Sequence, residues 1–185
     1  PKQIIISSNG IVESVDLADG NQLWSYAGVE KNTIPSATVT RDLILVGSSE
    51  RPSSIALPRD KSGALSKNHI IWTAEKATSS MSSPLVVGDC VYYVSRAGIL
   101  SCNDLNTGEQ LWDYRLPASC WATPIAVNNV IYFFCKDGNT VVLENNRKSP
   151  IELGASKLDI DEPVYGVAVV DNTIVMRTGN RLFAL

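Results

Sequence analysis

The sequence predicts an all-β protein, and within that class a β-propeller built from four-stranded antiparallel blades. Three observations support this prediction. The local hydrophobic pattern is that of short strands, turn-forming residues separate those strands, and the chain repeats itself at the length of one blade. We expect between four and five blades in these 185 residues, as part of a larger propeller.

Short runs of β-branched and aromatic residues occur along the chain, at residues 43–46, 91–94, 131–134 and 173–175. Each run is bounded by Gly, Asn or Asp, which favour turns. No window of a dozen residues repeats apolar side chains with the period of a helix. Strands at roughly ten-residue spacing are typical of a sandwich, a barrel or a propeller, and the repeats decide between them.

One series of repeats is carried by tryptophan. Residues 10–26 align without a gap on residues 98–114, at an offset of 88 residues. This offset spans two repeats, because Trp72 lies between Trp24 and Trp112.

A second series follows the same period. Ser83-Pro84 recurs 40 residues later as Thr123-Pro124, and the segment recurs 43 residues further on, around residues 167–172. A period of 40 to 48 residues with about four strands is the length of a propeller blade. We therefore expect one domain over residues 1–185, with a partial blade at 1–26, blades at 35–73, 83–114 and 123–153, and a partial blade at 164–185.

These units amount to 18 strands, which we letter A to D in each blade from the inside of the ring outwards. The first and last units then leave open sheet edges at residues 4–7 and 182–185. Because an unpaired edge invites pairing, we expect the isolated chain to close as a small ring or to self-associate.

The last strand of these units carries a Trp, and in two of them an Asp-x-x-x-Gly turn precedes it. The residues are Asp16, Gly20 and Trp24; Asp104, Gly108 and Trp112; and Trp72 between them. The Asp caps its own backbone, and the Gly supplies the positive φ that a short turn needs. Because the Trp keeps its place in successive repeats, we interpret it as a wedge between blades rather than as a binding platform.

This Asp-x-x-x-Gly-x-x-x-Trp pattern, with Ser83-Pro84 and Thr123-Pro124 opening blades, resembles the PQQ-like β-propeller repeat. Quinoprotein dehydrogenases share that repeat with the non-enzymatic outer-membrane assembly lipoproteins of the BamB type. The resemblance covers essentially the whole chain, and it looks closest to extracytoplasmic PQQ-like repeat proteins of planctomycete-type bacteria. It implies the propeller fold and an extracytoplasmic location, periplasmic or secreted, but it does not specify a function.

The chain departs from the quinoprotein alcohol dehydrogenases, which carry a vicinal Cys-Cys disulfide, a Trp beneath the quinone and a calcium site. No two of its four cysteines are adjacent: Cys90, Cys102, Cys120 and Cys135. We interpret them as buried thiols, although their even number permits disulfides in an oxidising compartment. Asp159, Asp161 and Glu162 lie in one loop, which is more typical of a solvated loop than of a metal site. We expect no cofactor and no metal ion.

Other functions are disfavoured by what the sequence lacks. His69 is the only histidine, so a catalytic triad has one candidate base, and no phosphate-binding glycine motif occurs. A net charge of −3 does not favour nucleic acid. No apolar run approaches the ~20 residues that span a bilayer. The chain begins at Pro1 without a signal peptide, and we expect it to begin within a longer protein.

Two functional hypotheses follow. The first is a non-enzymatic binding or scaffold module that holds a protein or polysaccharide partner on one propeller face. The second is a fragment of a quinone-dependent dehydrogenase whose active site lies in blades outside this sequence.

A candidate binding site follows from the strand order. Three successive turns between strands B and C carry a cation two residues before their glycine, namely Arg96, Lys136 and Arg177. These turns share a face of the ring with the connections between blades, one of which carries Trp121. Cations beside an exposed aromatic ring could bind a carboxylate, a sulfated sugar or an acidic protein loop. The alternative is three solvated turns whose basic residues coincide by chance.

Overall fold

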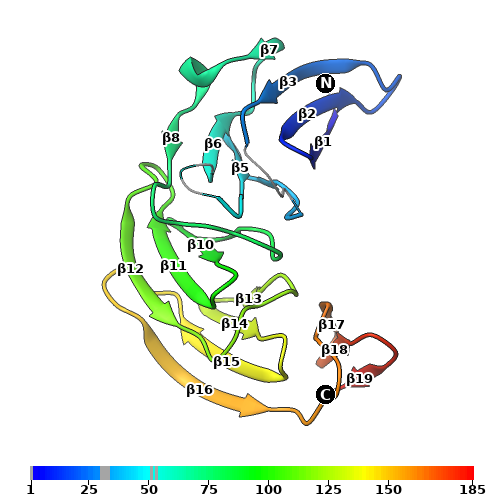
Figure 1. Cartoon of the computed structure of the whole chain (residues 1–185), viewed down its shortest axis with the longest axis vertical. Coiled ribbons are helices and arrows are strands. Elements are labelled where there is room, and N and C mark those ends of the chain that lie inside the picture. Colours follow the sequence, from blue (N-terminus) through cyan, green and yellow to red (C-terminus); the bar gives the residue numbers. More distant parts are fainter. Residues whose placement is uncertain (1, 30–33, 51, 53) are drawn as a thin grey trace.

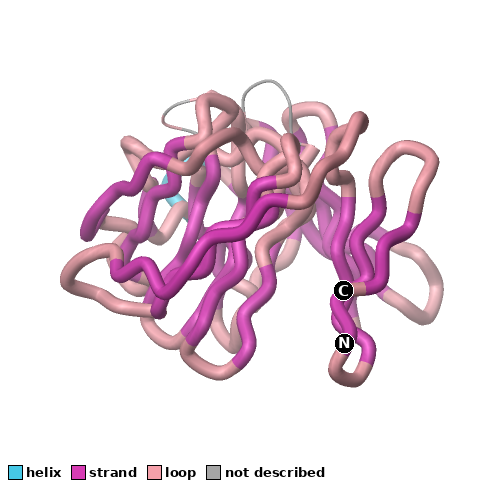
Figure 2. Tube along the Cα trace, turned by 90° about the horizontal axis from the view of Figure 1, so that it is seen from below, coloured by secondary structure: helices cyan, strands magenta, loops and turns pink. Residues whose placement is uncertain are grey.

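The computed structural model describes residues 2–29, 34–50, 52 and 54–185. Within these ranges the chain has 19 strands and one short 3₁₀ helix, η1 (Lys67–His69). The strands form five sheets that follow one another around an arc, with the first and last sheets on either side of its opening (Figure 1). Connecting loops lie on the two faces of the arc (Figure 2). The prediction of an all-β propeller is confirmed.

The first sheet contains β1 (Gln3–Ser8), β2 (Ile11–Asp16), β3 (Gln22–Ala27) and β7 (Gly63–Leu65). The second contains β4 (Thr38–Val39), β5 (Leu43–Val46), β6 (Ile55–Pro58) and β8 (Trp72–Thr73). The third contains β9 (Leu85–Val87), β10 (Cys90–Val94), β11 (Ile99–Asp104) and β12 (Gln110–Arg115). The fourth contains β13 (Ile125–Val127), β14 (Val130–Phe134), β15 (Asn139–Glu144) and β16 (Ile151–Lys157). The fifth contains β17 (Gly166–Val170), β18 (Thr173–Arg177) and β19 (Leu182–Ala184).

Two-residue turns join the two innermost strands of the third, fourth and fifth sheets. The first turn residue has a positive φ in each case: 57° at Gly88, 55° at Asn128 and 54° at Asp171. Gly, Asn and Asp tolerate this conformation better than other residues, so the turn sequence sets the register of these hairpins.

The apolar core lies between neighbouring sheets. Between the third and fourth sheets, the ring of Tyr92 lies 5.9 Å from that of Trp112 and 6.2 Å from that of Phe133 in the next blade. All three side chains are buried, because each inner sheet has a neighbour on both faces.

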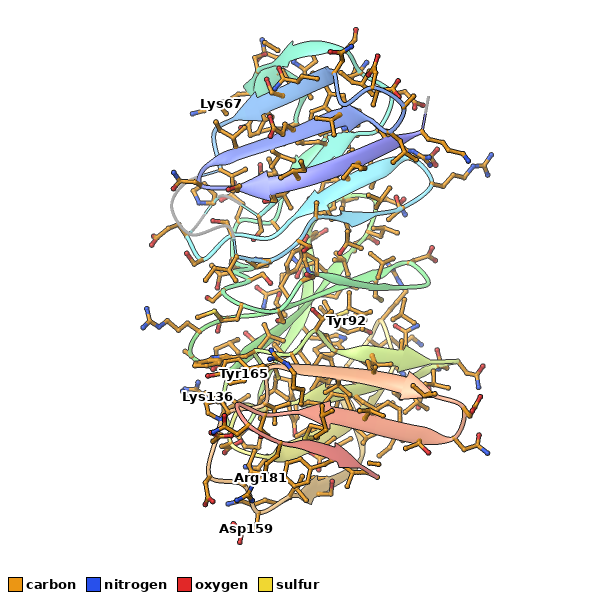
Figure 3. The ribbon with its side chains drawn as sticks, turned by 90° about the vertical axis from the view of Figure 1, so that its right-hand side faces the viewer. Lys67, Tyr92, Lys136, Asp159, Tyr165 and Arg181 are labelled. Atoms are coloured by element: carbon orange, nitrogen blue, oxygen red, sulfur yellow. The ribbon has the colours of Figure 1, made fainter. Side chains whose placement is uncertain are left out.

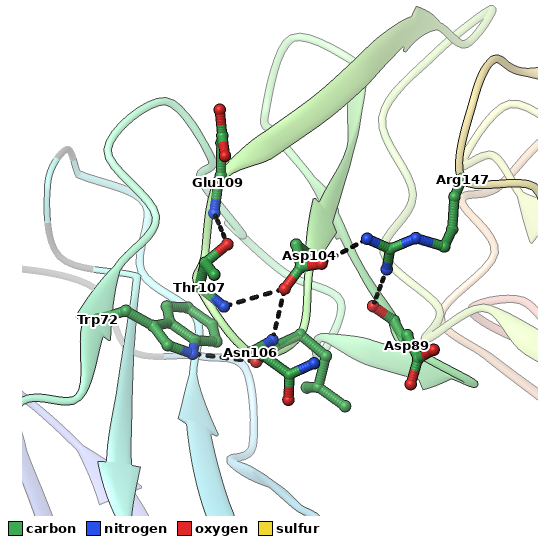
Figure 4. A network of polar contacts seen from close by, with 8 residues as sticks. Trp72, Asp89, Asp104, Asn106, Thr107, Glu109 and Arg147 are labelled. Atoms are coloured by element: carbon green, nitrogen blue, oxygen red, sulfur yellow. Dashed lines mark hydrogen bonds and ion pairs between the residues drawn. The ribbon is translucent and has the colours of Figure 1, made fainter.

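The outermost Trp of two blades lies against the C–D turn of the following blade. Figure 4 shows this arrangement for Trp72. The indole N–H of Trp72 donates to the carbonyl of Leu105 at 3.0 Å, and that of Trp112 donates to the carbonyl of Asn146 at 2.8 Å. The Trp72 ring occupies the space that a Cβ on Gly108 would need. Each Trp therefore links its own blade to the next one.

Asp104 holds the C–D turn of the third blade together. Its carboxylate accepts hydrogen bonds from the backbone N–H groups of Asn106 (2.8 Å) and Thr107 (3.0 Å). Arg147, from the fourth blade, donates to this carboxylate at 2.5 Å and to the carbonyl of Asp89 at 3.0 Å (Figure 4). The turn is thus fixed by its own backbone and by the neighbouring blade.

This ion pair predicts a pH-dependent contribution to stability. The hydrogen bond from Arg147 holds the pKa of Asp104 below its ordinary value. Such a group stabilises the fold above its unfolded-state pKa of about 4, and the contribution is lost as the pH falls through the lower folded-state pKa. We therefore expect Arg147→Gln to be less stable than the parent at neutral pH, and this difference to shrink below about pH 4. Denaturant unfolding at both pH values measures it, and a difference that is constant with pH would contradict the assignment.

The structure corrects the expected count of 18 antiparallel strands, because β7 is an additional strand and pairs parallel with β3. Gly63 lies opposite Trp24 in this pairing. β7 comes from the connection between β6 and β8, residues 59–71, which is longer than the corresponding connection at 105–109 in the third blade. The longer segment reaches back to the first sheet and covers the outer edge of β3.

Other boundaries differ less. β16 runs to Lys157, past the expected end of its blade at residue 153. The expected units 1–26 and 35–73 include residues 1, 51 and 53, which lie outside the described residues. β1 and β19 are edge strands, and both expose apolar side chains, Ile4 by 46% and Leu182 by 71%. In the described part of the chain, no helix is both long enough and apolar enough to cross a membrane.

Candidate ligand-binding site

Backbone hydrogen bonds connect three loops on one face of the arc. The N–H of Lys136, in the turn between β14 and β15, donates to the carbonyl of Ser119 at 2.9 Å. The carbonyl of Lys136 accepts from the N–H of Val164 at 3.2 Å. Ser119 lies in the connection that enters the fourth blade, and Val164 in the connection that enters the fifth sheet. These bonds fix the relative positions of the three loops.

Two aromatic rings and two cations meet on these loops and on the adjoining strand β18. We call Trp121, Lys136, Tyr165 and Arg177 the aromatic–cation cluster. The ring centroids of Trp121 and Tyr165 lie 5.3 Å apart, with an interplanar angle of 55°. The Nζ atom of Lys136 lies 5.7 Å from the centroid of Trp121, and the Cζ atom of Arg177 lies 5.4 Å from that of Tyr165. Lys136 and Tyr165 lie at the same face of the molecule (Figure 3).

The cluster is open to solvent and suited to anions. Lys136 and Arg177 are exposed, Tyr165 is 42% exposed, and Trp121 is half-buried. The ring faces attract the ammonium and guanidinium groups and hold them near the aromatic surface. The exposed N–H groups can still donate to a carboxylate, which a guanidinium binds through two parallel hydrogen bonds.

The structure brings together three of the four predicted site residues and leaves out Arg96. Arg96 is exposed on the corresponding turn of the third blade, and it forms no ion pair or ring contact with any described residue. The position 40 residues before Trp121 is Met81, so the connection next to Arg96 offers no aromatic ring. The repeats do not predict Tyr165, although it lies just before the innermost strand of its sheet, as Trp121 does.

An acidic loop lies beside the cluster. The carboxylate of Glu162 accepts hydrogen bonds from the backbone N–H and the side-chain amide of Asn180, both at 2.7 Å, and from the hydroxyl of Thr178 at 3.3 Å. Glu162 therefore anchors the turn between β18 and β19. Asp159 and Asp161 are exposed, and in the described ranges no three His, Cys, Asp or Glu side chains are grouped as metal ligands would be.

The histidine and the cysteines have structural surroundings. The Nδ1 atom of His69 accepts a hydrogen bond from the backbone N–H of Ser66 at 3.0 Å and so caps η1. All four cysteines are free and buried, and the sulfur atoms of Cys120 and Cys135 lie 3.9 Å apart. Burial raises the pKa of the Cys102 thiol, which lowers its reactivity.

Comparison with known proteins supports the fold. The sequence matches the family model described as outer membrane protein assembly factor BamB over residues 2–150 and 63–185. BamB from Moraxella catarrhalis is similar in structure, with a TM-score of 0.75 and 21% identity, over 99% of this chain and 54% of that one. The computationally designed protein Ika4 is similar over 90% of this chain and 98% of its own, with a TM-score of 0.69 and 12% identity. The chain thus spans about half the length of the BamB structure. No curated protein matches it.

Proposed function

The chain belongs to the family of the outer membrane protein assembly factor BamB, and from this premise we propose that it is a non-enzymatic scaffold that binds a protein partner. The observation that carries the proposal is the aromatic–cation cluster, which lies on one propeller face and is built from the fourth blade, the fifth sheet and the connections leading into them. Rigid blades that present loops in fixed positions are well suited to such a role.

The partner we propose is an acidic protein segment. Each of the two exposed cations lies within 6 Å of one ring centroid, Lys136 of Trp121 and Arg177 of Tyr165. Because the two ring centroids lie 5.3 Å apart, a single short segment can contact all four side chains. Carboxylates of the segment would pair with Lys136 and Arg177, while its apolar atoms pack on Trp121 and Tyr165. A carboxylated or sulfated polysaccharide is the other partner that the sequence suggested, and the experiment below separates the two.

Three narrower features belong to the same proposal. We propose an extracytoplasmic location and the nearer resemblance to planctomycete-type repeat proteins, both of which rest on the repeat pattern. We also propose self-association through the exposed edges of β1 and β19, since each of these strands is paired on one side only in the described part of the chain, β1 with β2 and β19 with β18. The alternative, a quinone-dependent dehydrogenase, would carry its active site in blades outside this sequence.

The binding proposal predicts a selective effect of charge removal. We expect a fluorescently labelled hexaglutamate peptide to bind the parent at low salt, and the Lys136→Gln/Arg177→Gln variant to bind it at least about tenfold more weakly. Trp121→Ala should weaken binding as well, because the ring holds Lys136 in place. Fluorescence anisotropy measures the affinity, and added salt should reduce it.

Arg96→Gln is the matched control, because Arg96 occupies the equivalent turn but lies outside the cluster. It should bind the peptide like the parent. An equal loss in Arg96→Gln, or binding of neither the peptide nor heparin by the parent, would refute the site. Retention of the parent on heparin without peptide binding would instead identify a polysaccharide partner and overturn the assignment to protein.

A further inference from the structure

A cavity lies between the first two sheets, away from the aromatic–cation cluster. It has a volume of about 620 Å³ and is lined by Gln3, Leu23, Arg41, Arg59, Asp60, Lys61 and Ser62. Arg41 lies in the turn between β4 and β5, and the segment 59–62 follows β6. Turns of these two kinds share the face opposite to the aromatic–cation cluster. We infer that this cavity is a binding site for a small oxyanion with two or three negative charges, a phosphate or a polycarboxylate.

The cavity exists because the second blade lacks the C–D turn seen in the third. Its chain starts in the same way, since the N–H of Arg59 donates to the carbonyl of Asp42 (3.2 Å) as that of Leu105 donates to Asp89 (2.9 Å). The paths then diverge, because residues 63–65 pair with β3 instead of folding back as a tight turn. The space that the C–D turn fills in the third blade is therefore left open in the second blade.

In the described part of the chain, the indole N–H of Trp24 lacks the hydrogen-bond partner that a C–D turn provides in the next two blades. Trp24 is buried, with 1% of its surface exposed, and its indole nitrogen has no hydrogen-bond partner among the described residues. The equivalent nitrogens of Trp72 and Trp112 donate to carbonyls of the C–D turn in the next blade. A buried donor without a partner is costly, so this blade interface bears a cost that the interfaces at Trp72 and Trp112 avoid.

The charge of the lining selects anions. Three cations and one carboxylate face the cavity, in a chain whose net charge is −3. None of these four groups forms an ion pair with another described residue. The guanidinium of Arg59 donates to the carbonyl of Arg41 at 3.3 Å, which holds it over the cavity wall. Cations without an ion-pair partner around a cavity can donate hydrogen bonds to an oxyanion bound in it.

Polar side chains add donors at the rim. The side-chain oxygen of Gln3 accepts a hydrogen bond from the hydroxyl of Ser14 at 2.5 Å, which leaves its amide N–H groups for a ligand. Ser62 contributes a hydroxyl. A compact anion with several oxygen atoms can use both kinds of donor, whereas an apolar ligand would leave them unpaired.

The test is calorimetric titration of the whole chain with citrate and with inorganic phosphate at low salt. We expect saturable binding of at least one of them, and an affinity at least about tenfold lower in Arg41→Gln/Lys61→Gln. Both residues are exposed, so the melting temperature of the variant without ligand should match that of the parent.

Two controls make the outcome specific. Lys148→Gln removes an exposed cation from the corresponding connection of the fourth blade, and it should bind the anion like the parent. Lys136→Gln/Arg177→Gln should also retain this binding, so that failure of the cluster and failure of the cavity are distinguishable. Absence of saturable binding to both anions, or an equal loss in Lys148→Gln, would overturn the inference.

Discussion

Replacing Trp112 by alanine is expected to lower the free energy of unfolding by about 3–5 kcal/mol. The substitution removes a ring packed beside Tyr92 and the hydrogen bond that its indole N–H donates to Asn146 in the next blade. It would therefore leave a cavity at a blade interface. Urea unfolding followed by tryptophan fluorescence or circular dichroism measures the loss.

Trp121→Ala is the matched control for Trp112→Ala. Trp121 is half-buried on a propeller face, so its loss should cost clearly less, about 1 kcal/mol. An unchanged melting temperature in Trp112→Ala, together with lost ligand binding, would show that Trp112 is a binding residue and not a wedge.

Gly108→Ala should be much more harmful than Gly20→Ala, although both glycines occupy the same place in their turns. Their φ values are nearly equal, 73° and 74°, so the backbone strain of an alanine, about 1 kcal/mol, is common to both. A Cβ at Gly20 meets no atom within 4 Å, whereas one at Gly108 would overlap the Trp72 ring. Overpacking adds about 1–3 kcal/mol, so we expect a total of about 2–4 kcal/mol for Gly108→Ala.

This pair of variants isolates the contact between blades. The backbone strain is common to both, so it cancels in the difference between their free energies of unfolding. Denaturant unfolding of both variants gives that difference. Equal losses would mean that the Trp72 ring moves aside without cost and that the turn does not depend on it.

The parts of the fold that depend on local sequence could be predicted. Strands, two-residue turns and the Asp104–Gly108 turn follow from neighbouring residues, and the repeats then place them in blades. β7 could not be predicted, because three residues that pair with a strand some 40 positions away carry no local signal. One indication was present: Trp72 follows Trp24 by 48 positions, whereas Trp112 follows Trp72 by 40.

The same distinction holds for the candidate site. Lys136, Arg177 and Trp121 were found because they stand at aligned positions relative to turns or strands. Tyr165 lies in a connection whose sequence does not match the earlier repeats, so its place could not be predicted by alignment. The backbone hydrogen bond of the preceding residue, Val164, to Lys136 fixes this connection beside Trp121. Arg96 matched the pattern equally well. A cation can pack on a ring only if the connection that enters its blade carries an aromatic residue, and in the third blade that connection has Met81 in the place of Trp121.

The strand β7 has a consequence for cooperativity. In a repeat protein, neighbouring units are usually coupled through side-chain contacts, so that one unit can open while the next stays folded. Here a backbone ladder joins β3 of the first sheet to a segment of the second blade. Unfolding of the second blade would therefore break the main-chain hydrogen bonds between β7 and β3 of the first sheet. These two units should behave as a single unfolding block, and the independent steps of the array should begin at the third blade.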